Sequence, residues 1–300
     1  MTRLSEIQSH IASMDELLDI VGAMRSLAGM RLQEAQHALS GIRTYAHSMA
    51  AGIGSALLLM PQPVTETRQQ QNRCALIVCT AEHGVVGGFN ERMLEAADAI
   101  LEPSDLLFVL GSRAAALAFE RGRKVTWTRP MATRLAGAPD AVNRLTSELY
   151  ARIARGEITR VDVMFCRYRQ GAASTIERRQ LLPLDTATLV TKLAHQPPLR
   201  NLPPRPLLEK LMAEYVFALL TEAAVESIAS ENAARFAAME SAHDNVSKKL
   251  AELQENARRA RQTEITSELL DLITGAEAMH VGSRRVIRES RVLQRMPRQS

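Results

Sequence analysis

Apolar residues recur at alternating spacings of three and four along roughly the first fifty residues of the chain. The series comprises Leu4, Ile7, Ile11, Met14, Leu18, Val21, Arg25, Ala28, Leu32, Ala35, Leu39, Ile42, Ala46, Met49 and Ile53. Arg25 is its one charged member, and no proline occurs before Pro61. Such spacing over about seven heptads predicts a coiled-coil helix within residues 1–60. At the rise of an α-helix, about fifty residues span about 75 Å.

The same alternation returns in the last third of the chain, where no proline lies between Pro206 and Pro297. The series is Phe236, Met239, His243, Val246, Leu250, Leu253, Ala257 and Ala260, and after a phase shift Ile265, Leu269, Leu272, Ala276 and Met279. A helix over residues 207–280 is on the order of 110 Å long, whereas a compact chain of this size has a radius of gyration of only about 19 Å. We therefore expect both helices to protrude as one antiparallel pair, each burying the apolar seam of the other.

The middle of the chain has a different rhythm. Residues 74–79 and 105–110 are short continuous apolar runs, as in buried parallel strands, and each is followed by a helical stretch. Further strands are predicted over residues 124–128, 161–165 and 173–182, with a helix over 140–155. The fold class is thus α/β with dominant helix: a long coiled coil plus a small Rossmann-like α/β domain over residues 73–184. Five prolines mark residues 185–206 as the linker out of that domain.

The net charge of +4 is unevenly distributed. Residues 281–300 alone carry +5, from Arg284, Arg285, Arg288, Arg291, Arg295 and Arg298 against Glu289, so the remaining residues sum to −1. No stretch interleaves basic with aromatic residues, so nucleic-acid binding is not expected. A disordered, solvated basic tail is the simplest interpretation. Contact with an acidic partner surface or an anionic membrane is the alternative.

Cysteine spacing and hydropathy indicate a cytoplasmic protein. Cys74, Cys79 and Cys166 are an odd number without CxxC spacing, and we interpret them as reduced core thiols. The longest apolar stretch, residues 50–60, is far shorter than the roughly 20 residues of a transmembrane helix. The N-terminal residues contain no apolar signal-peptide region, so no secretory signal is expected.

The loop after the first predicted strand is the one place where an α/β domain of this kind would cradle a phosphate. It reads T-A-E-H-G-V-V-G-G-F-N from Thr80 to Asn90, which matches neither GxGxxG nor GxxxxGK[ST]. A tight strand-to-helix turn is therefore favoured over nucleotide binding. Glu82 and His83 have no nucleophile or metal-ligand set at matching spacing, so we expect no catalysis, cofactor or metal. His243, on the seam, is interpreted as a hydrogen-bonded core histidine.

Arg25 leaves two interpretations open, because an unpaired guanidinium in the seam would cost several kcal/mol. In one, the helices pair with a shifted phase and the side chain reaches out of the seam. In the other, Arg25 points toward another protein.

Three stretches carry a family resemblance. Ile11 and Ser13 are followed by A-M-R-S-L-A from Ala23, which is similar to A-M-[KRE]-x-[VL]-A in the γ subunit of F-type ATP synthases. The C-terminal part reads S-E-N-A-A-R-F-A-A-M from Ser230 and A-R-Q-T-E-I-T-S-E from Ala260. It resembles the family patterns S-E-x-x-A-R-x-x-A-M and A-R-Q-x-x-I-T-x-E. The loop G-V-V-G-G-F-N from Gly84 resembles G-L-C-G-G-x-N more loosely.

The resemblance implies the central-stalk γ subunit, a rotor shaft that couples ion flow through the membrane c-ring to ATP synthesis or hydrolysis at the ring of α and β subunits. It further implies a non-catalytic, peripheral subunit on the cytoplasmic face of the inner (plasma) membrane, with the α/β domain against the ε subunit and the c-ring. Matched positions imply β-subunit contacts at Met24, Arg25, Arg261, Gln262, Thr266 and Glu268. They also imply a foot-domain loop near ε and the c-ring at Gly84, Gly87, Gly88 and Asn90.

The chain departs from the family pattern in its acidic residues 15–19, in the missing loop cysteine and in the basic extension after Met279. Two rival functions are a stand-alone coiled-coil scaffold with an α/β docking domain, and a nucleotide-dependent enzyme that uses the loop 84–90. Neither rival explains the C-terminal motif.

Overall fold

The computed structural model describes residues 2–59, 73–169, 174–185, 189 and 201–293. The chain divides into two bodies, Gly22–Ser241 and the pair of segments Met1–Val21 and Ala242–Ser300. Most of the proline-rich linker predicted at residues 185–206 lies outside the described residues.

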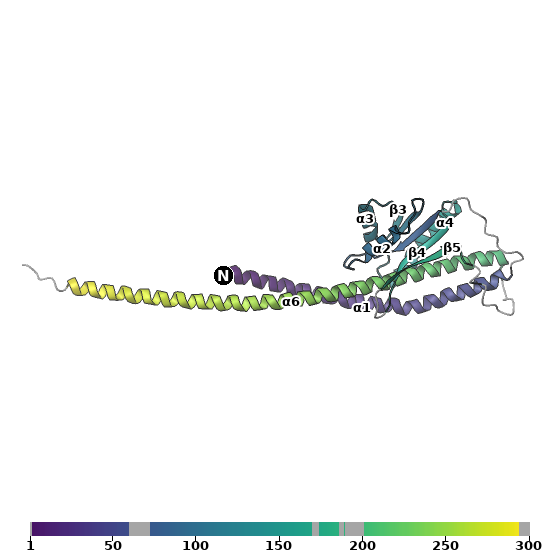
Figure 1. Cartoon of the computed structure of the whole chain (residues 1–300). Coiled ribbons are helices and arrows are strands. Elements are labelled where there is room, and N and C mark those ends of the chain that lie inside the picture. Colours follow the sequence, from purple (N-terminus) through teal and green to yellow (C-terminus); the bar gives the residue numbers. More distant parts are fainter. Residues whose placement is uncertain (1, 60–72, 170–173, 186–188, 190–200, 294–300) are drawn as a thin grey trace, which may run out of the picture. The chain divides into compact units, whose positions relative to one another are not determined.

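Two long helices, α1 (Thr2–Leu57) and α6 (Pro204–Leu293), account for nearly half of the chain, as predicted (Figure 1). α6 begins three residues earlier than the predicted Leu207, because prolines are tolerated in the first turn of a helix. It also continues through residues 281–293. The expectation of a disordered tail is therefore wrong for that part of the basic segment.

A five-stranded sheet forms the core of the α/β domain. Its strands are β1 (Cys74–Cys79), β2 (Leu106–Leu110), β3 (Val125–Arg129), β4 (Arg160–Arg167) and β5 (Thr175–Leu182). Their order is β3-β2-β1-β4-β5, with β5 antiparallel to β4 and the other neighbours parallel. The parallel pairing predicted from the apolar runs is confirmed, since β1 and all but the first residue of β2 are buried.

Helices cover both faces of this sheet. Leu76 and Val78 pack with α2 (Phe89–Asp98) and α3 (Ser112–Glu120) on one face. The alternate side chains of β1 pack with α4 (Ala138–Ala154) and with α1 and α6 on the other face. A short 3₁₀ helix, η1 (Leu135–Gly137), precedes α4. The coiled coil therefore serves as one layer of the α/β domain.

The three cysteines are free and buried, which confirms their interpretation as core thiols. Burial raises the pKa of the Cys79 thiol to about 12. Such a thiol is protonated at neutral pH and therefore unreactive.

The seam of the coiled coil is confirmed in the body Gly22–Ser241. Its buried positions on α1 are Ala28, Ala35, Leu39, Ala46 and Ile53, all at most 6% exposed. Three of these five are alanines, which allow a partner helix to approach closely. All five belong to the predicted series, whereas Gly54 and Ala56, which are also buried on α1, lie outside it.

Candidate functional site

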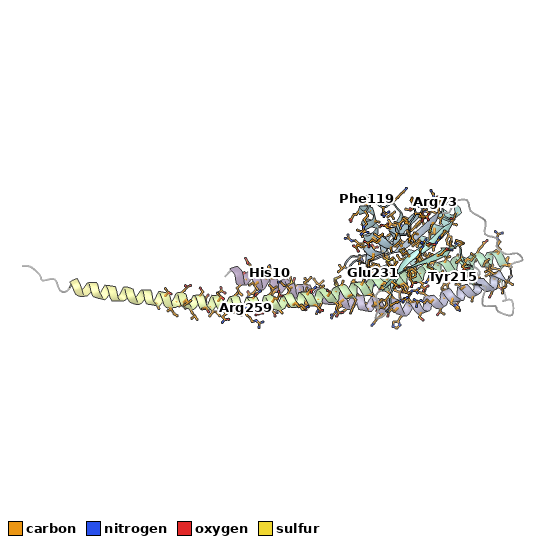
Figure 2. All side chains as sticks on the ribbon, viewed as in Figure 1. His10, Arg73, Phe119, Tyr215, Glu231 and Arg259 are labelled. Carbon is orange, nitrogen blue, oxygen red and sulfur yellow. The ribbon has the colours of Figure 1, made fainter. Side chains whose placement is uncertain are left out.

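The part of α6 that passes the sheet is buried on every side. All residues from 218 to 232 are buried, including polar ones, and Glu231 marks this stretch in Figure 2. The Ser227 hydroxyl donates to the carbonyl oxygen of Cys79 at 2.7 Å, at the end of β1. The Ser230 hydroxyl donates to the carbonyl oxygen of Cys166 at 2.7 Å, near the end of β4. Two serines of α6 thus satisfy main-chain acceptors of neighbouring strands.

Arg235 extends this contact to the loop after β1. Its Nη2 donates to Glu231 Oε1 at 2.7 Å and to the carbonyl oxygen of Gly84 at 3.4 Å, and its Nη1 donates to Asn232 Oδ1 at 3.3 Å. Arg235 and Glu231 are both less than 10% exposed. Burial raises the pKa of Glu231 above its ordinary value, and the charge of Arg235 opposes that rise.

The loop from Gly84 to Asn90 forms the tight strand-to-helix turn that the sequence predicts. Val85 and Gly87 have positive φ values of 62° and 58°. The buried Asn90 side chain closes the turn, since its Oδ1 accepts the N–H of Ala81 at 3.0 Å. A valine in the left-handed region is strained and persists only where its surroundings hold it. Gly84 and Gly88 have open space where a Cβ would lie.

The Glu82 carboxylate has a structural role in this turn region. It accepts the backbone N–H groups of Ser112 at 2.9 Å and Met131 at 2.8 Å. Burial alone would raise the pKa of Glu82, but these hydrogen bonds outweigh it and lower the pKa. Gly111, just before Ser112, has φ 126°, and a Cβ there would lie 2.3 Å from Thr80 Oγ1. Because any side chain at position 111 would clash with Thr80, glycine is required where this segment passes Thr80.

A network of charged residues joins both long helices to the sheet. Glu222 on α6 accepts from Arg43 of α1 at 3.0 Å and from Arg179 of β5 at 2.7 Å. Although burial favours the neutral acid, these two arginines hold the pKa of Glu222 below its ordinary value. Glu226 pairs with Arg43 and, at 3.5 Å, with Arg167 of β4. Burial raises the pKa of Glu226, and the arginines offset this only in part.

Met24 and Arg25 lie half-buried on α1. Arg25 Nη1 lies 3.5 Å from Glu240 Oε1 on α6, and its side chain is 33% exposed. Within the described chain, therefore, Arg25 reaches out of the seam to an acidic neighbour.

Arg261, Gln262, Thr266 and Glu268 lie on an exposed stretch of α6 in the other body. The Thr266 hydroxyl donates to the Gln262 carbonyl at 2.8 Å within the helix. In this stretch the expected seam is not buried, because Ile265, Leu269 and Leu272 are 51%, 54% and 70% exposed. His243 is likewise not a core histidine, since its side chain is 31% exposed.

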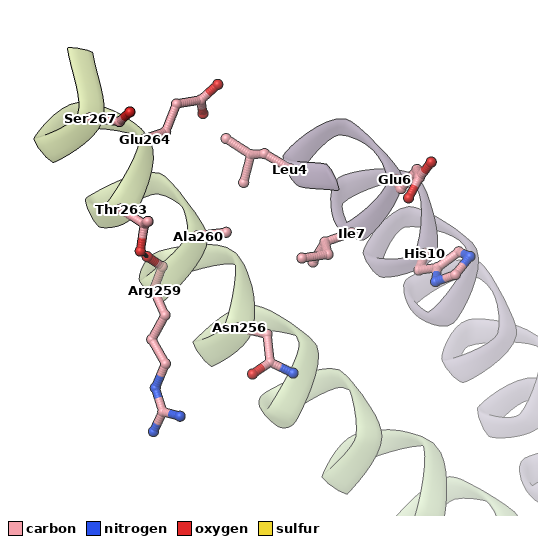
Figure 3. Close-up of a pocket in the computed structure, with 10 residues that line it drawn as sticks. All are labelled: Leu4, Glu6, Ile7, His10, Asn256, Arg259, Ala260, Thr263, Glu264 and Ser267. Atoms are coloured by element: carbon pink, nitrogen blue, oxygen red, sulfur yellow. Dashed lines mark hydrogen bonds between the residues drawn. The ribbon is translucent and has the colours of Figure 1, made fainter. Parts of the chain in front are cut away.

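An open cleft of about 810 Å³ separates the two helices of the body formed by Met1–Val21 and Ala242–Ser300. Leu4 and Ile7 of α1 face Ala260 of α6 across it, while Arg259 points away (Figure 3). α1 begins at Thr2, level with this cleft. Among the described residues, Ser267 is the last of α6 that lines this cleft, and Leu269 and Leu272 beyond it are exposed.

Comparison with known proteins decides between the functions left open by the sequence. The family model described as ATP synthase matches residues 3–279. This chain belongs to the family of ATP synthase γ chains. The γ chain of Chlorobaculum tepidum is 27% identical over 93% of this chain and 99% of its own length. That of Chlorobaculum parvum is 24% identical over the same shares.

Solved structures agree with this family in fold. The central stalk and c-ring structure of the Tetrahymena thermophila mitochondrial ATP synthase contains a chain with a TM-score of 0.54 and 15% identity, covering 74% of this chain and 99% of that one. A chain of the Euglena gracilis mitochondrial ATP synthase has a TM-score of 0.51 and 16% identity, covering 87% and 96%. The predicted fold class is thereby confirmed, as is the function of a γ chain, the central stalk of the rotary complex.

The structure gives the C-terminal motif of this γ chain a role that the sequence pattern alone does not predict. In the sequence, the motif from Ser230 to Arg235 is recognisable only as a family signature. In the structure, Ser230 and Arg235 form hydrogen bonds between α6 and the α/β domain. Ser227 was not singled out at all. Its signal is the recurrence of polar side chains, Ser227, Ser230, Glu231 and Arg235, on one helix face.

Two further observations concern the described part of the γ chain. No helix there combines the length and apolar character needed to cross a membrane. Nor do the described residues bring three His, Cys, Asp or Glu side chains together as a metal site.

Proposed function

We propose that this chain is the rotating shaft that couples ion flow through a membrane c-ring to ATP synthesis or hydrolysis in a ring of α and β subunits. An asymmetric shaft contacts each β subunit differently, so its rotation shifts the nucleotide affinity of each catalytic site in turn. The chain itself is non-catalytic and binds no nucleotide. Its place is the cytoplasmic face of the membrane, where it is held through the complex.

The contacts follow the assignment made from the sequence. Met24 and Arg25 on α1, and Arg261, Gln262, Thr266 and Glu268 on α6, face the β subunits. Arg261 pairs there with a carboxylate, and the neutral side chains donate or accept hydrogen bonds. The α/β domain over residues 73–184 lies against ε and the c-ring, with Gly84, Gly87, Gly88 and Asn90 in the loop nearest to them.

The exposed stretch of α6 carries this proposal. Ile265, Leu269 and Leu272 recur at helical spacing and are more than half exposed. A contiguous apolar stripe of this kind marks an interaction surface. The polar residues assigned to β contact, Gln262, Thr266 and Glu268, are interspersed with this stripe and are also exposed. A ring that encloses the helix would cover both sets at once.

Reconstitution tests the proposal. The full chain is mixed with purified cognate α and β subunits, and the mixture is examined by size-exclusion chromatography and for steady-state ATP hydrolysis. We expect one large complex whose hydrolysis rate is well above that of α and β alone. A homodimer without affinity for α and β would instead favour the scaffold.

A matched variant separates the apolar stripe from the rest of α6. Leu272→Ser should weaken assembly, whereas Leu253→Ser, on the half-buried part of the seam, should act on the stability of the helix pair. Assembly of Leu272→Ser at wild-type strength would contradict the proposed surface.

A further inference from the structure

Three side chains of α6 bind main-chain carbonyl oxygens of the α/β domain from one face of the helix. Ser227 and Ser230 bind the carbonyls of Cys79 and Cys166, and Arg235 binds that of Gly84. These acceptors lie at the end of β1, near the end of the adjacent parallel strand β4, and in the loop that follows β1. One helix face thus forms hydrogen bonds to three acceptors at the carboxyl-terminal end of the parallel strands.

The surroundings of the two serine bonds exclude water, whereas the bond from Arg235 to the exposed Gly84 is only partly buried. Ser227 and Ser230 are each 1% exposed, and Arg235 is 7% exposed. Residues next to them, such as Ile228 and Ala229, are apolar and equally buried. The carbonyl of Cys79 or Cys166, left without its serine donor, loses a hydrogen bond that solvent does not replace.

Directional hydrogen bonds can fix the register of α6 on the sheet, which apolar packing alone cannot do. Apolar contacts are non-directional, so a helix on an apolar sheet face can shift or rotate with little change in buried area. Buried polar groups with few possible partners specify one register, as single polar residues do in coiled coils. Displacing α6 along the sheet by one residue would break all three bonds together.

We propose that Ser227, Ser230 and Arg235 form a polar joint that fixes the register of α6 on the sheet, so that the α/β domain and the stalk helix turn as one body. The three residues are positioning residues, and Glu231 and Asn232 orient the Arg235 guanidinium. Through Gly84 the joint also holds the strained turn at Val85. This inference rests on the proposed rotation of the shaft under load.

The test uses the triple variant Ser227→Ala, Ser230→Ala and Arg235→Met in the full chain, assembled with its cognate subunits in sealed vesicles. ATP hydrolysis and the ATP-driven membrane potential are measured together. A potential-sensitive dye responds to either transported cation, so the identity of the ion is not needed. We expect hydrolysis to persist while the potential generated per ATP falls about fivefold or more. An unchanged ratio overturns the joint.

Two variants separate the joint from general stability. Arg205→Met removes an exposed ion pair with Glu209 on the same helix and should leave the ratio unchanged. Arg235→Lys keeps a cationic donor within reach of Glu231 and the Gly84 carbonyl, and should recover at least part of the coupling. Equal losses in Arg235→Lys and Arg235→Met would count against a directed bond to the loop.

Hydrogen exchange on the isolated full chain tests the proposed polar joint independently of the complex. In the triple variant, amides of residues 84–90 should exchange about tenfold faster, while those within β1 keep their protection. Unchanged protection of the loop, or equal loss across the whole sheet, overturns the proposal. Failure of the wild-type chain to assemble or pump would instead refute the proposed function and leave this measurement valid.

Discussion

Two stretches of α6 differ sharply although they belong to one continuous helix. Residues 218–232 are buried throughout, whereas almost all of residues 261–276 are exposed. Both stretches contain apolar residues at helical spacing, and both overlap a family motif. The difference lies in their neighbours among the described residues: a sheet and a second helix pack on the first stretch, whereas the beginning of the second lines the open cleft against α1.

From this difference we infer that one C-terminal signature serves two purposes. Ser230, Glu231 and Arg235 form hydrogen bonds within the molecule, while Gln262, Thr266 and Glu268 are exposed and are the residues proposed to contact other subunits. Substitutions in the first stretch should act on stability, and those in the second on assembly and coupling. The following predictions test that division.

The largest effect is expected for Ile228→Ala in the buried stretch. Ile228 is 2% exposed, so the truncation should lower the free energy of unfolding by about 2–5 kcal/mol. Ile273→Ala, the same change on the same helix at a side chain 57% exposed, should cost less than about 0.5 kcal/mol. Urea unfolding followed by Trp127 fluorescence measures both, since Trp127 packs against the buried Phe108. Similar losses of unfolding free energy in the two variants would contradict the division of α6 into a structural stretch and a subunit-contact stretch.

The second prediction concerns Glu222, whose pKa is lowered in the folded chain. A lowered carboxyl pKa contributes stability that is present above the unfolded pKa of about 4.3 and is lost as pH falls through the folded pKa. Glu222→Gln should therefore destabilise the chain by about 1–3 kcal/mol at pH 7. The gap to wild type should narrow as pH falls below about 4.3.

Denaturation midpoints at pH 7 and in mild acid provide this comparison. Glu209→Gln is the matched control, because Glu209 is an exposed member of a pair on the same helix. A gap that stays constant on acidification would mean that Glu222 stabilises by packing rather than by its charge.

Arg25→Ala should have a smaller effect on stability. The pair with Glu240 is 3.5 Å long and both side chains are partly exposed, so its loss should cost less than about 1 kcal/mol. If Arg25 also contacts a β subunit, the variant should lower ATP hydrolysis of the assembled complex out of proportion to this loss. Hydrolysis that matches wild type would assign Arg25 to the helix pair alone.

Gln262→Ala should leave stability unchanged within about 0.5 kcal/mol, because the side chain is exposed. Coupling should weaken nonetheless, seen as lower torque and slower ATP turnover in the assembled complex. Gln254→Ala, an exposed glutamine on the same helix, is the control. Unchanged torque and turnover in Gln262→Ala would remove this residue from the contact.

Much of the fold was predictable because it depends on local periodicity. Three-four spacing and the absence of proline predicted α1 and α6, and continuous apolar runs predicted β1 and β2 as parallel strands. The sequence also predicted buried thiols and a tight turn at Gly84. Each of these features depends on residues close together along the chain, whose side-chain pattern directly reflects the period of a helix or strand.

The tertiary structure decided which parts of those patterns are buried and what the polar residues bind. Ile265, Leu269 and Leu272 continue the seam in sequence, but all three are more than half exposed in the structure. Ser227, Ser230 and Arg235 look like ordinary helix residues until the ends of β1 and β4 are placed beside them. A periodic pattern specifies an element and its apolar face, whereas burial and hydrogen-bond partners depend on which distant segment packs there.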